Sequence, residues 1–274
     1  MVASRDVRLP DGRVIRAYDS EFDDRTGVLL WHHGSPQTGL PLDPLLVAAA
    51  ERGIRLLSYA RPGYGGSTRL DGRTVGAAAD DVAHVADAFG IDRFAVMGAS
   101  GGGPHALACA AALPDRITGA VCLASIAPYT EEFDWFAGMV SPGGLQAALQ
   151  GTAARQHFAS IDEFDPASFT SADMDALAGP WASLGADAQR AGEAGTDGLV
   201  DDDVAFTMPW HIDLTAITAP VLLVQGQQDR VVPPSHADWL HTRIPKAQLW
   251  SRPEDGHVSI LRECGPAMDW LLQL

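Results

Sequence analysis

The feature of this sequence that most constrains its fold is the alternation of short apolar segments with helical patterns along much of the chain. The apolar segments end in turn residues, as buried strands commonly do. Strands that alternate with helices pair in parallel and carry helices on both faces of the sheet. The sequence therefore predicts an α/β fold with a mostly parallel central sheet. The apolar segments cover residues 27–36, 54–67, 94–103 and 119–128, and the helical patterns cover residues 44–53, 74–90 and 104–116.

The alternation stops between residues 129 and 211, a region rich in Ala, Gly, Asp and aromatic residues that has no convincing buried strand. We expect a helical insertion here, which divides the core into residues 1–128 and residues 212–274. At the N-terminus, apolar and charged residues alternate around a Pro-Asp-Gly turn at residues 10–12, a pattern typical of an antiparallel hairpin. The second part of the core continues with an apolar strand and loop at residues 219–233, a helix at 236–244, a strand at 247–251 and an amphipathic helix at 260–274.

Composition suits one large domain and excludes several classes of function. Of the 274 residues 46% are hydrophobic, and 35 Asp and Glu against 19 Lys and Arg give a formal charge of −16. This charge repels nucleic acids and anionic membrane surfaces. No apolar stretch has the length of a membrane span or the character of a secretory signal. Cys109, Cys122 and Cys264 lack the spacing of a zinc site or a disulfide framework. We expect a cytoplasmic monomer or homodimer that acts on a small molecule without a metal.

A serine lies at the junction between the third apolar strand and the helix that follows it. Residues 98–102 read Gly-Ala-Ser-Gly-Gly and satisfy the pattern G-x-S-x-G, which marks a nucleophile when a strand precedes it and a helix follows. The sharp turn strains the backbone at Ser100, and the flanking glycines allow neighbouring segments to approach closely. A phosphate-binding loop would need a lysine that is missing here, and Ser100 replaces the second glycine of a dinucleotide-binding motif. A simple helix cap remains the structural alternative.

A serine hydroxyl becomes a strong nucleophile when a base removes its proton and an acid orients that base. Asp229 follows an apolar strand, at the edge where ligands bind to parallel sheets. His257 lies in the loop after the next strand. The chain order Ser100, Asp229, His257 is the order of a triad that begins with this motif. Taken singly, the two partners are also typical of turns and helix caps. Asp255 is a rival acid, but it lies too near His257 in the chain to reach the far ring nitrogen.

Two backbone N–H groups are candidates to stabilise an oxyanion. One follows the nucleophile, at Gly101, and the second comes from the loop after an earlier strand. Gly34 permits an unusual turn in that loop and is a candidate substrate contact, and the next residue, Ser35, presents the second N–H. We interpret His33 as a residue that organises this loop rather than as a base. The Ser35 hydroxyl is expected to form a local turn hydrogen bond.

Together, these motifs resemble those of the α/β-hydrolase family. The segments HGSP, RPGYGGS, GASGGG, GQQDRVVP and DGH occur in the order typical of that family. The resemblance covers most of the chain outside residues 129–211. It implies the α/β-hydrolase fold, acyl chemistry without a cofactor, and an insertion that forms a helical cap over the substrate pocket. It also implies a catalytic triad of Ser100, Asp229 and His257 and an oxyanion hole at Ser35 and Gly101.

The implied cap contains aromatic and Met residues that are candidates to line the pocket, although such side chains often pack a small helical cap together instead. Trp135 and Trp210 are the first candidates for substrate contact, because they lie near the two junctions with the core. Residues 201–203, three consecutive aspartates, lack the spacing of a calcium loop, and we interpret them as acids at a helix N-terminus. The other candidates are Phe133, Phe136, Met139, Trp181, Phe206 and Met208.

The sequence thus predicts a serine hydrolase that cleaves a carboxylic ester or a related small acyl substrate through an acyl-enzyme. Family members that open epoxides or displace halides use an aspartate nucleophile, and Ser100 argues against both reactions. Proline-iminopeptidase-like enzymes share a loop similar to residues 61–67, but they need acidic cap residues to hold the substrate amine, and none can be assigned from the sequence. That activity, carbon–carbon bond hydrolysis and cofactor-free perhydrolysis stay open, as does a hydrolase-fold protein that binds a ligand without turnover.

Overall fold

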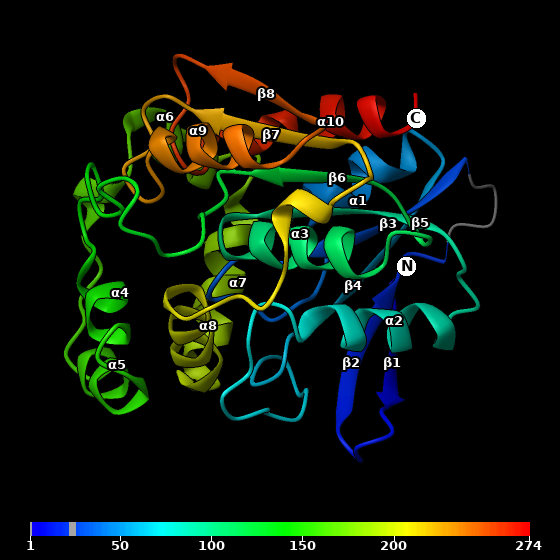
Figure 1. The fold of residues 1–274 in the computed structure, drawn as a ribbon, viewed down its shortest axis with the longest axis horizontal. Coiled ribbons are helices and arrows are strands. Elements are labelled where there is room, and N and C mark those ends of the chain that lie inside the picture. Colours follow the sequence, from blue (N-terminus) through cyan, green and yellow to red (C-terminus); the bar gives the residue numbers. More distant parts are fainter. Residues whose placement is uncertain (1, 22–25) are drawn as a thin grey trace.

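The computed structural model describes residues 2–21 and 26–274. Within these residues, eight strands form one sheet in the order β1-β2-β4-β3-β5-β6-β7-β8 (Figure 1). Strands β3 to β8 pair in parallel, whereas β1 and β2 form an antiparallel hairpin that joins the sheet through β4. The predicted α/β fold with a mostly parallel sheet is confirmed. The strands are Ala3–Arg8, Val14–Asp19, Gly27–His32, Ile54–Tyr59, Phe94–Ala99, Ile117–Leu123, Val221–Gly226 and Ala247–Arg252, numbered β1 to β8 in this order.

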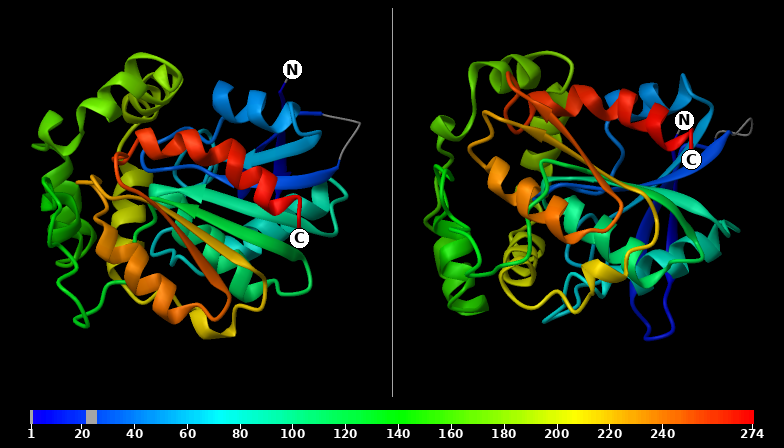
Figure 2. Two further views of the ribbon diagram at one scale, coloured as in Figure 1. Left: turned by 90° about the horizontal axis from the view of Figure 1, so that it is seen from above. Right: turned by 45° about the horizontal axis from the view of Figure 1, so that its top comes forward.

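Helices cover both faces of the sheet, as Figures 1 and 2 show. On one face lie α2 (Ala78–Ala88), α3 (Gly103–Ala112) and α9 (Pro234–Arg243). On the other face lie α1 (Asp43–Ala50) and α10 (Cys264–Leu271). The sheet is therefore the middle of three layers, and its parallel strands have no face left open to water.

The central strands are apolar throughout because they bury both faces. All six residues of β5 are buried. Successive side chains of a strand point to opposite faces, and Val96 lies in the core that contains Leu107 of α3. Its neighbour Met97 packs in the core that contains Leu45 of α1 and Met268 of α10. This double burial explains why the strands read as continuous apolar runs in the sequence.

Between β6 and β7 the chain leaves the sheet and forms five α-helices within residues 129–211, the segment called the cap below. The cap lies beyond the carboxyl ends of the parallel strands (Figures 1 and 2). Its last helix, α8, is also part of the body of the protein, because Ala205 and Phe206 belong to the core that contains α3. The cap helices α4 to α8 are Gly143–Ala148, Thr152–Ala159, Ser171–Ala178, Ala182–Glu193 and Asp197–Thr207.

The turn from β5 into α3 is sterically crowded. Ser100 has a φ of 53°, in the left-handed region that residues other than glycine rarely adopt. A Cβ on Gly98 would overlap the carbonyl oxygen of Gly102, and a Cβ on Gly102 would overlap the carbonyl oxygen of His32 at the end of β3. Both glycines are therefore required by the close approach of backbone segments, as the sequence motif predicts.

We predict that Gly102→Ala destabilises the protein, because the added methyl group meets backbone atoms rather than a movable side chain. The expected loss is about 1–3 kcal/mol of unfolding free energy, measured by chemical denaturation. Gly192→Ala is the control, because Gly192 lies in α7 and an added Cβ meets no atom within 4 Å. Helix propensity is expected to raise the stability of this control by about 0.5–1 kcal/mol. Equal stability of Gly102→Ala and wild type would contradict the steric explanation.

Candidate active site

The structure brings Ser100, His257 and Asp229 together at the carboxyl edge of the sheet. His257 Nε2 lies 3.0 Å from Ser100 Oγ, and His257 Nδ1 lies 2.8 Å from Asp229 Oδ2. Oδ1 of Asp229 accepts the N–H groups of Val231 and Val232 at 2.9 and 2.8 Å, which fixes the carboxylate. Because the carboxylate can only accept, Nδ1 carries the proton and Nε2 is free to accept the Ser100 hydroxyl proton. The arrangement is that of a nucleophile, a base and an orienting acid.

Electrostatics poise His257 as a base. Burial lowers the pKa of His257, but the charge and hydrogen bond of Asp229, together with the charge of Asp173, raise it to a net value above the ordinary 6.5. The rival acid, Asp255, pairs with Arg262 at 2.9 Å. The structure therefore places Asp229, rather than Asp255, on the histidine, in agreement with the ranking from sequence.

The structure also brings together the two loops that carry the predicted oxyanion donors. A Cβ on Gly101 would overlap Ser35 Oγ, so the loop after β3 touches the backbone that follows Ser100. His33 organises this loop as expected, since its Nδ1 donates to the Gly34 carbonyl at 2.7 Å and its Nε2 accepts the Arg61 N–H at 3.1 Å. Burial, with a further contribution from the nearby Arg61 charge, holds the pKa of His33 well below its usual range.

The Ser35 hydroxyl does not form the local turn hydrogen bond expected from sequence. It donates to Asp202 of α8 and accepts from Arg61 at 3.0 Å. Arg61 also donates to the carbonyl of Gly34 at 3.1 Å and to Asp202 at 2.7 Å. Arg73 and Tyr64 reach the same carboxylate, at 2.7 and 2.8 Å. A buried ionic cluster therefore ties the last cap helix to the loop after β3. Such a cluster is stable only when hydrogen bonds satisfy its charged groups.

The interpretation of residues 201–203 as acids at a helix N-terminus is wrong. Helix α8 begins at Asp197, so the three aspartates lie in its middle, where each pairs with a different group. Burial alone would raise the pKa of Asp202. The charges of Arg61 and Arg73 outweigh this effect and hold the pKa of Asp202 well below its usual range. In Asp203, burial outweighs the charge of Arg155 and raises the pKa to about 6. The remaining ion pairs are Asp201 with Arg69 at 2.8 Å and Asp203 with Arg155 at 2.6 Å.

A further cap residue, Asp173 of α6, holds the histidine loop and was not recognised in the sequence. Its Oδ1 accepts the N–H groups of Val258 and Ser259, both at 2.8 Å, and the Ser259 hydroxyl at 2.9 Å. Its Oδ2 accepts the N–H and hydroxyl of Thr170 as part of a capping box. Burial alone would raise the pKa of Asp173, but these hydrogen bonds lower it by a larger amount. The pKa of Asp173 therefore lies below its ordinary value, and the carboxylate stays charged. One side chain thus starts a cap helix and clamps the two residues after His257.

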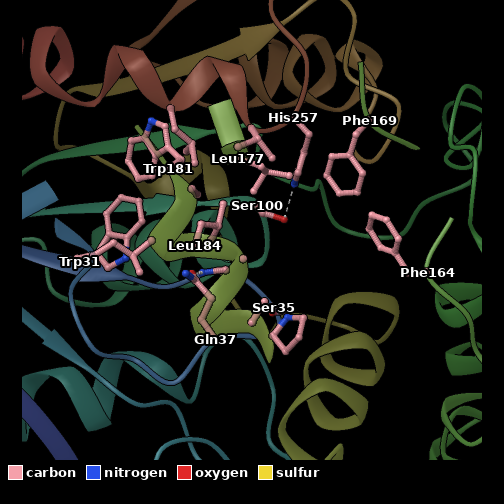
Figure 3. Close-up of a pocket in the computed structure, with 18 residues that line it drawn as sticks. Trp31, Ser35, Gln37, Ser100, Phe164, Phe169, Leu177, Trp181, Leu184 and His257 are labelled. Atoms are coloured by element: carbon pink, nitrogen blue, oxygen red, sulfur yellow. Dashed lines mark hydrogen bonds between the residues drawn. The ribbon is translucent and has the colours of Figure 1, made fainter. Parts of the chain in front are cut away.

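Ser100 and His257 face a cavity of about 380 Å³ between the cap and the core. In Figure 3 they lie between Trp181, Leu177 and Leu184 on one side and Phe164 and Phe169 on the other. No Lys, Arg, Asp or Glu is among the lining residues that the structure describes. Gly34 and Ser35 also line this cavity, so the predicted contact at Gly34 is present in its wall. Such a cavity accepts an uncharged, mainly apolar small molecule.

Trp135 and Trp210, the first candidates for substrate contact, do not line this cavity, so the prediction that they contact the substrate is wrong. The Trp135 indole donates to the Ala127 carbonyl at 3.0 Å and packs edge-to-face on His236. The Trp210 indole donates to the Phe206 carbonyl at 3.1 Å. Residues near the junctions anchor the cap in the core, and the pocket is lined by the middle of the cap. Of the other candidates, Trp181 lines the cavity, Phe206 is in the core, Met208 is exposed, and Phe133, Phe136 and Met139 pack against the core.

Comparisons with known proteins give a consistent result. A family model described as "alpha/beta hydrolase fold" matches residues 27–263. A bifunctional esterase/perhydrolase of Acinetobacter calcoaceticus is 26% identical over 221 residues, which cover 75% of each chain. Two solved structures share the fold. A bromoperoxidase from Bacillus anthracis has a TM-score of 0.76 and 21% identity over 100% of both chains. An esterase from Thermogutta terrifontis has a TM-score of 0.74 and 20% identity over 99% of this chain and 98% of its own.

No helix within residues 2–21 and 26–274, the segments that the structure describes, is both long and apolar enough to cross a membrane. No group of three or more His, Cys, Asp or Glu residues within them is arranged to hold a metal ion.

We predict that Asp173→Asn lowers the pKa of His257, because it removes a negative charge that favours the protonated imidazole. The variant also leaves the Thr170 donors facing an amide N–H₂ group, so the melting temperature is expected to fall. NMR titration of the His257 ring protons measures the pKa. Asp175→Asn is the matched control, because Asp175 is an exposed residue of the same helix. An unchanged His257 pKa in Asp173→Asn would refute the coupling between the cap and the histidine.

Proposed function

Because this chain belongs to the α/β-hydrolase-fold family, we propose that it is a serine hydrolase that cleaves small, uncharged carboxylic esters. The observation that supports this most strongly is the hydrogen-bonded series from Ser100 through His257 to Asp229, which opens into an apolar cavity. The strained turn at Ser100 holds the hydroxyl in that cavity rather than in a helix-capping position, since no side-chain cap hydrogen bond is formed at the start of α3.

In the first half of the proposed reaction, Ser100 Oγ attacks the ester carbonyl carbon while His257 Nε2 takes the hydroxyl proton. Asp229 stabilises the resulting imidazolium cation. The N–H groups of Ser35 and Gly101 stabilise the negative oxygen of the tetrahedral intermediate, and one such donor typically accounts for about 10²–10³ in turnover. His257 then gives its proton to the leaving alcohol, the carbon–oxygen bond breaks, and an acyl-enzyme remains.

In the second half, His257 takes a proton from a water molecule, which attacks the acyl-enzyme through a second tetrahedral intermediate. The proton returns to Ser100 Oγ as the carboxylic acid leaves. No step requires a metal or an organic cofactor. The ionic cluster around Asp202 supports this chemistry indirectly, because it holds the loop that carries the Ser35 N–H.

The cavity also discriminates among the other activities open to this family. An aminopeptidase must hold a substrate amine with a free carboxylate, but the cap aspartates at residues 201–203 are paired with arginines. The cavity wall, as far as the structure describes it, carries no Asp or Glu. Both observations disfavour a proline-iminopeptidase-like activity and favour an uncharged ester.

A second candidate, perhydrolysis, is supported by the Acinetobacter calcoaceticus relative, whose name includes both esterase and perhydrolase. In that reaction hydrogen peroxide replaces water in the second half and releases a peracid with the same return of the proton to Ser100. Peracid formation from an ester and hydrogen peroxide, measured by iodide oxidation, tests this activity alongside hydrolysis.

We predict that wild-type protein hydrolyses a series of p-nitrophenyl esters with an initial burst of p-nitrophenol, and that Ser100→Ala abolishes both burst and turnover. The burst reports the acyl-enzyme, and the chain length with the highest kcat/KM reports the size of the cavity. Circular dichroism of Ser100→Ala checks that the fold is retained. Turnover that survives in Ser100→Ala, or a wild type without ester turnover, would contradict the proposed function.

The pH dependence follows from the raised pKa of His257. As the base, His257 acts in its neutral form, so kcat/KM is expected to fall as the pH drops through a pKa that lies above the ordinary 6.5. The measurement is kcat/KM for one ester across pH 5 to 9. In Asp229→Asn, turnover is expected to fall by about 10⁴-fold, because the imidazole loses the carboxylate that keeps its proton on Nδ1 and stabilises its cation. A midpoint below the ordinary value in wild type would contradict the assigned electrostatics.

A further inference from the structure

The cavity wall contains one amide side chain whose N–H₂ group donates no hydrogen bond to the described residues. Its described lining residues include four with hydroxyl, amide or imidazole groups, namely Ser35, Gln37, Ser100 and His257. Ser35, Ser100 and His257 are engaged in the hydrogen bonds described above. Gln37 is 4% exposed, so bulk water has little access to it, and Figure 3 shows it near Ser35 and Leu184.

The orientation of the Gln37 amide is fixed by its hydrogen bond. Gln37 Oε1 accepts the N–H of Gly34 at 2.5 Å. A backbone N–H cannot donate to an amide N–H₂ group, so the oxygen must face Gly34 and Nε2 must lie on the other side of the amide plane. Among the described residues, Nε2 donates to no protein acceptor. Nε2 is not one of the fully buried polar atoms that lack a partner. Because Gln37 lines the cavity, this N–H₂ group is free to donate to an acceptor bound there.

This amide lies close to the reacting centre. The position that a Cβ on Gly34 would occupy is 3.3 Å from Gln37 Oε1 and 3.8 Å from Ser100 Cβ. Gln37 and Ser100 also line the same cavity, so one small molecule bound there can contact both residues. The remaining surroundings, which include Leu184 and Trp181, are apolar.

We propose that Gln37 Nε2 binds a second oxygen atom of the substrate, close to the ester carbonyl. The inference rests on the proposed ester hydrolysis and names its substrate class: uncharged esters whose acyl part carries an ether, keto or hydroxyl oxygen within a few bonds of the carbonyl. Carboxylates do not belong to this class, because the described cavity wall carries no Lys or Arg to pair with them.

The test uses two isosteric pairs of p-nitrophenyl esters, methoxyacetate with butanoate and 3-methoxypropanoate with pentanoate. Each pair exchanges one methylene group for oxygen at a different distance from the carbonyl. The ratio of kcat/KM within each pair is compared between wild type and Gln37→Glu. That variant keeps an acceptor for the Gly34 N–H but replaces the Nε2 donor with an oxygen. Differences in intrinsic ester reactivity cancel in this comparison.

We expect the oxygen-to-methylene ratio to fall about tenfold in Gln37→Glu for at least one pair, the size of one hydrogen bond. Gln37→Met, which lacks both amide functions, is expected to lower the same ratio and also to slow both esters, because Gly34 loses its acceptor. Unchanged ratios for both pairs in both variants would overturn the inference while ester hydrolysis stands. Absence of Ser100-dependent turnover in wild type on all four esters would overturn the proposed function and this inference with it.

Discussion

Steric crowding at the turn from β5 to α3 is the constraint on which the rest of the site depends. Ser100 adopts a left-handed backbone conformation, and a Cβ on either Gly98 or Gly102 would overlap the backbone that packs around this turn. This geometry sets the serine side chain at the edge of the sheet, where His257 reaches it. It also brings the backbone after Ser100 against the loop that contains Ser35. Ser100, His257 and the backbone N–H groups that we propose as oxyanion donors are thus placed relative to one another by backbone packing.

Buried carboxylates then fix the cap to this framework. Asp202 connects α8 to the loop after β3 directly and through Arg61, and Asp173 connects α6 to the backbone that follows His257. Breaking such a buried interaction leaves an uncompensated charge, which typically destabilises a protein by about 3–5 kcal/mol. The cap therefore helps to position Ser35 and His257, the residues to which the proposed function assigns catalytic roles, in addition to providing the wall of the cavity.

Sequence was sufficient for the features that depend on local chemistry and chain order. The alternation of apolar strands and helices predicted the sheet, and the elbow with Asp229 and His257 in order predicted which side chains meet. Sequence was not sufficient for long-range partner choice. Nothing local shows that Asp202 pairs with an arginine about 140 residues earlier, although Arg61 lies in a motif already noted. For Trp135 the error was to equate nearness to a chain junction with nearness to the cavity, since junction residues are the ones that anchor the cap.

The most direct test of the central claim, that Ser100 is an activated nucleophile, is covalent labelling with a fluorophosphonate followed by peptide mass spectrometry. Such a reagent requires a serine whose proton is removed by a neighbouring base and whose oxyanion is stabilised. The structure predicts one phosphonyl group per chain on the peptide that contains Ser100, with labelling lost in His257→Ala. Failure of the reagent to label Ser100 in folded wild-type protein, or labelling that persists without His257, would contradict the catalytic assignment.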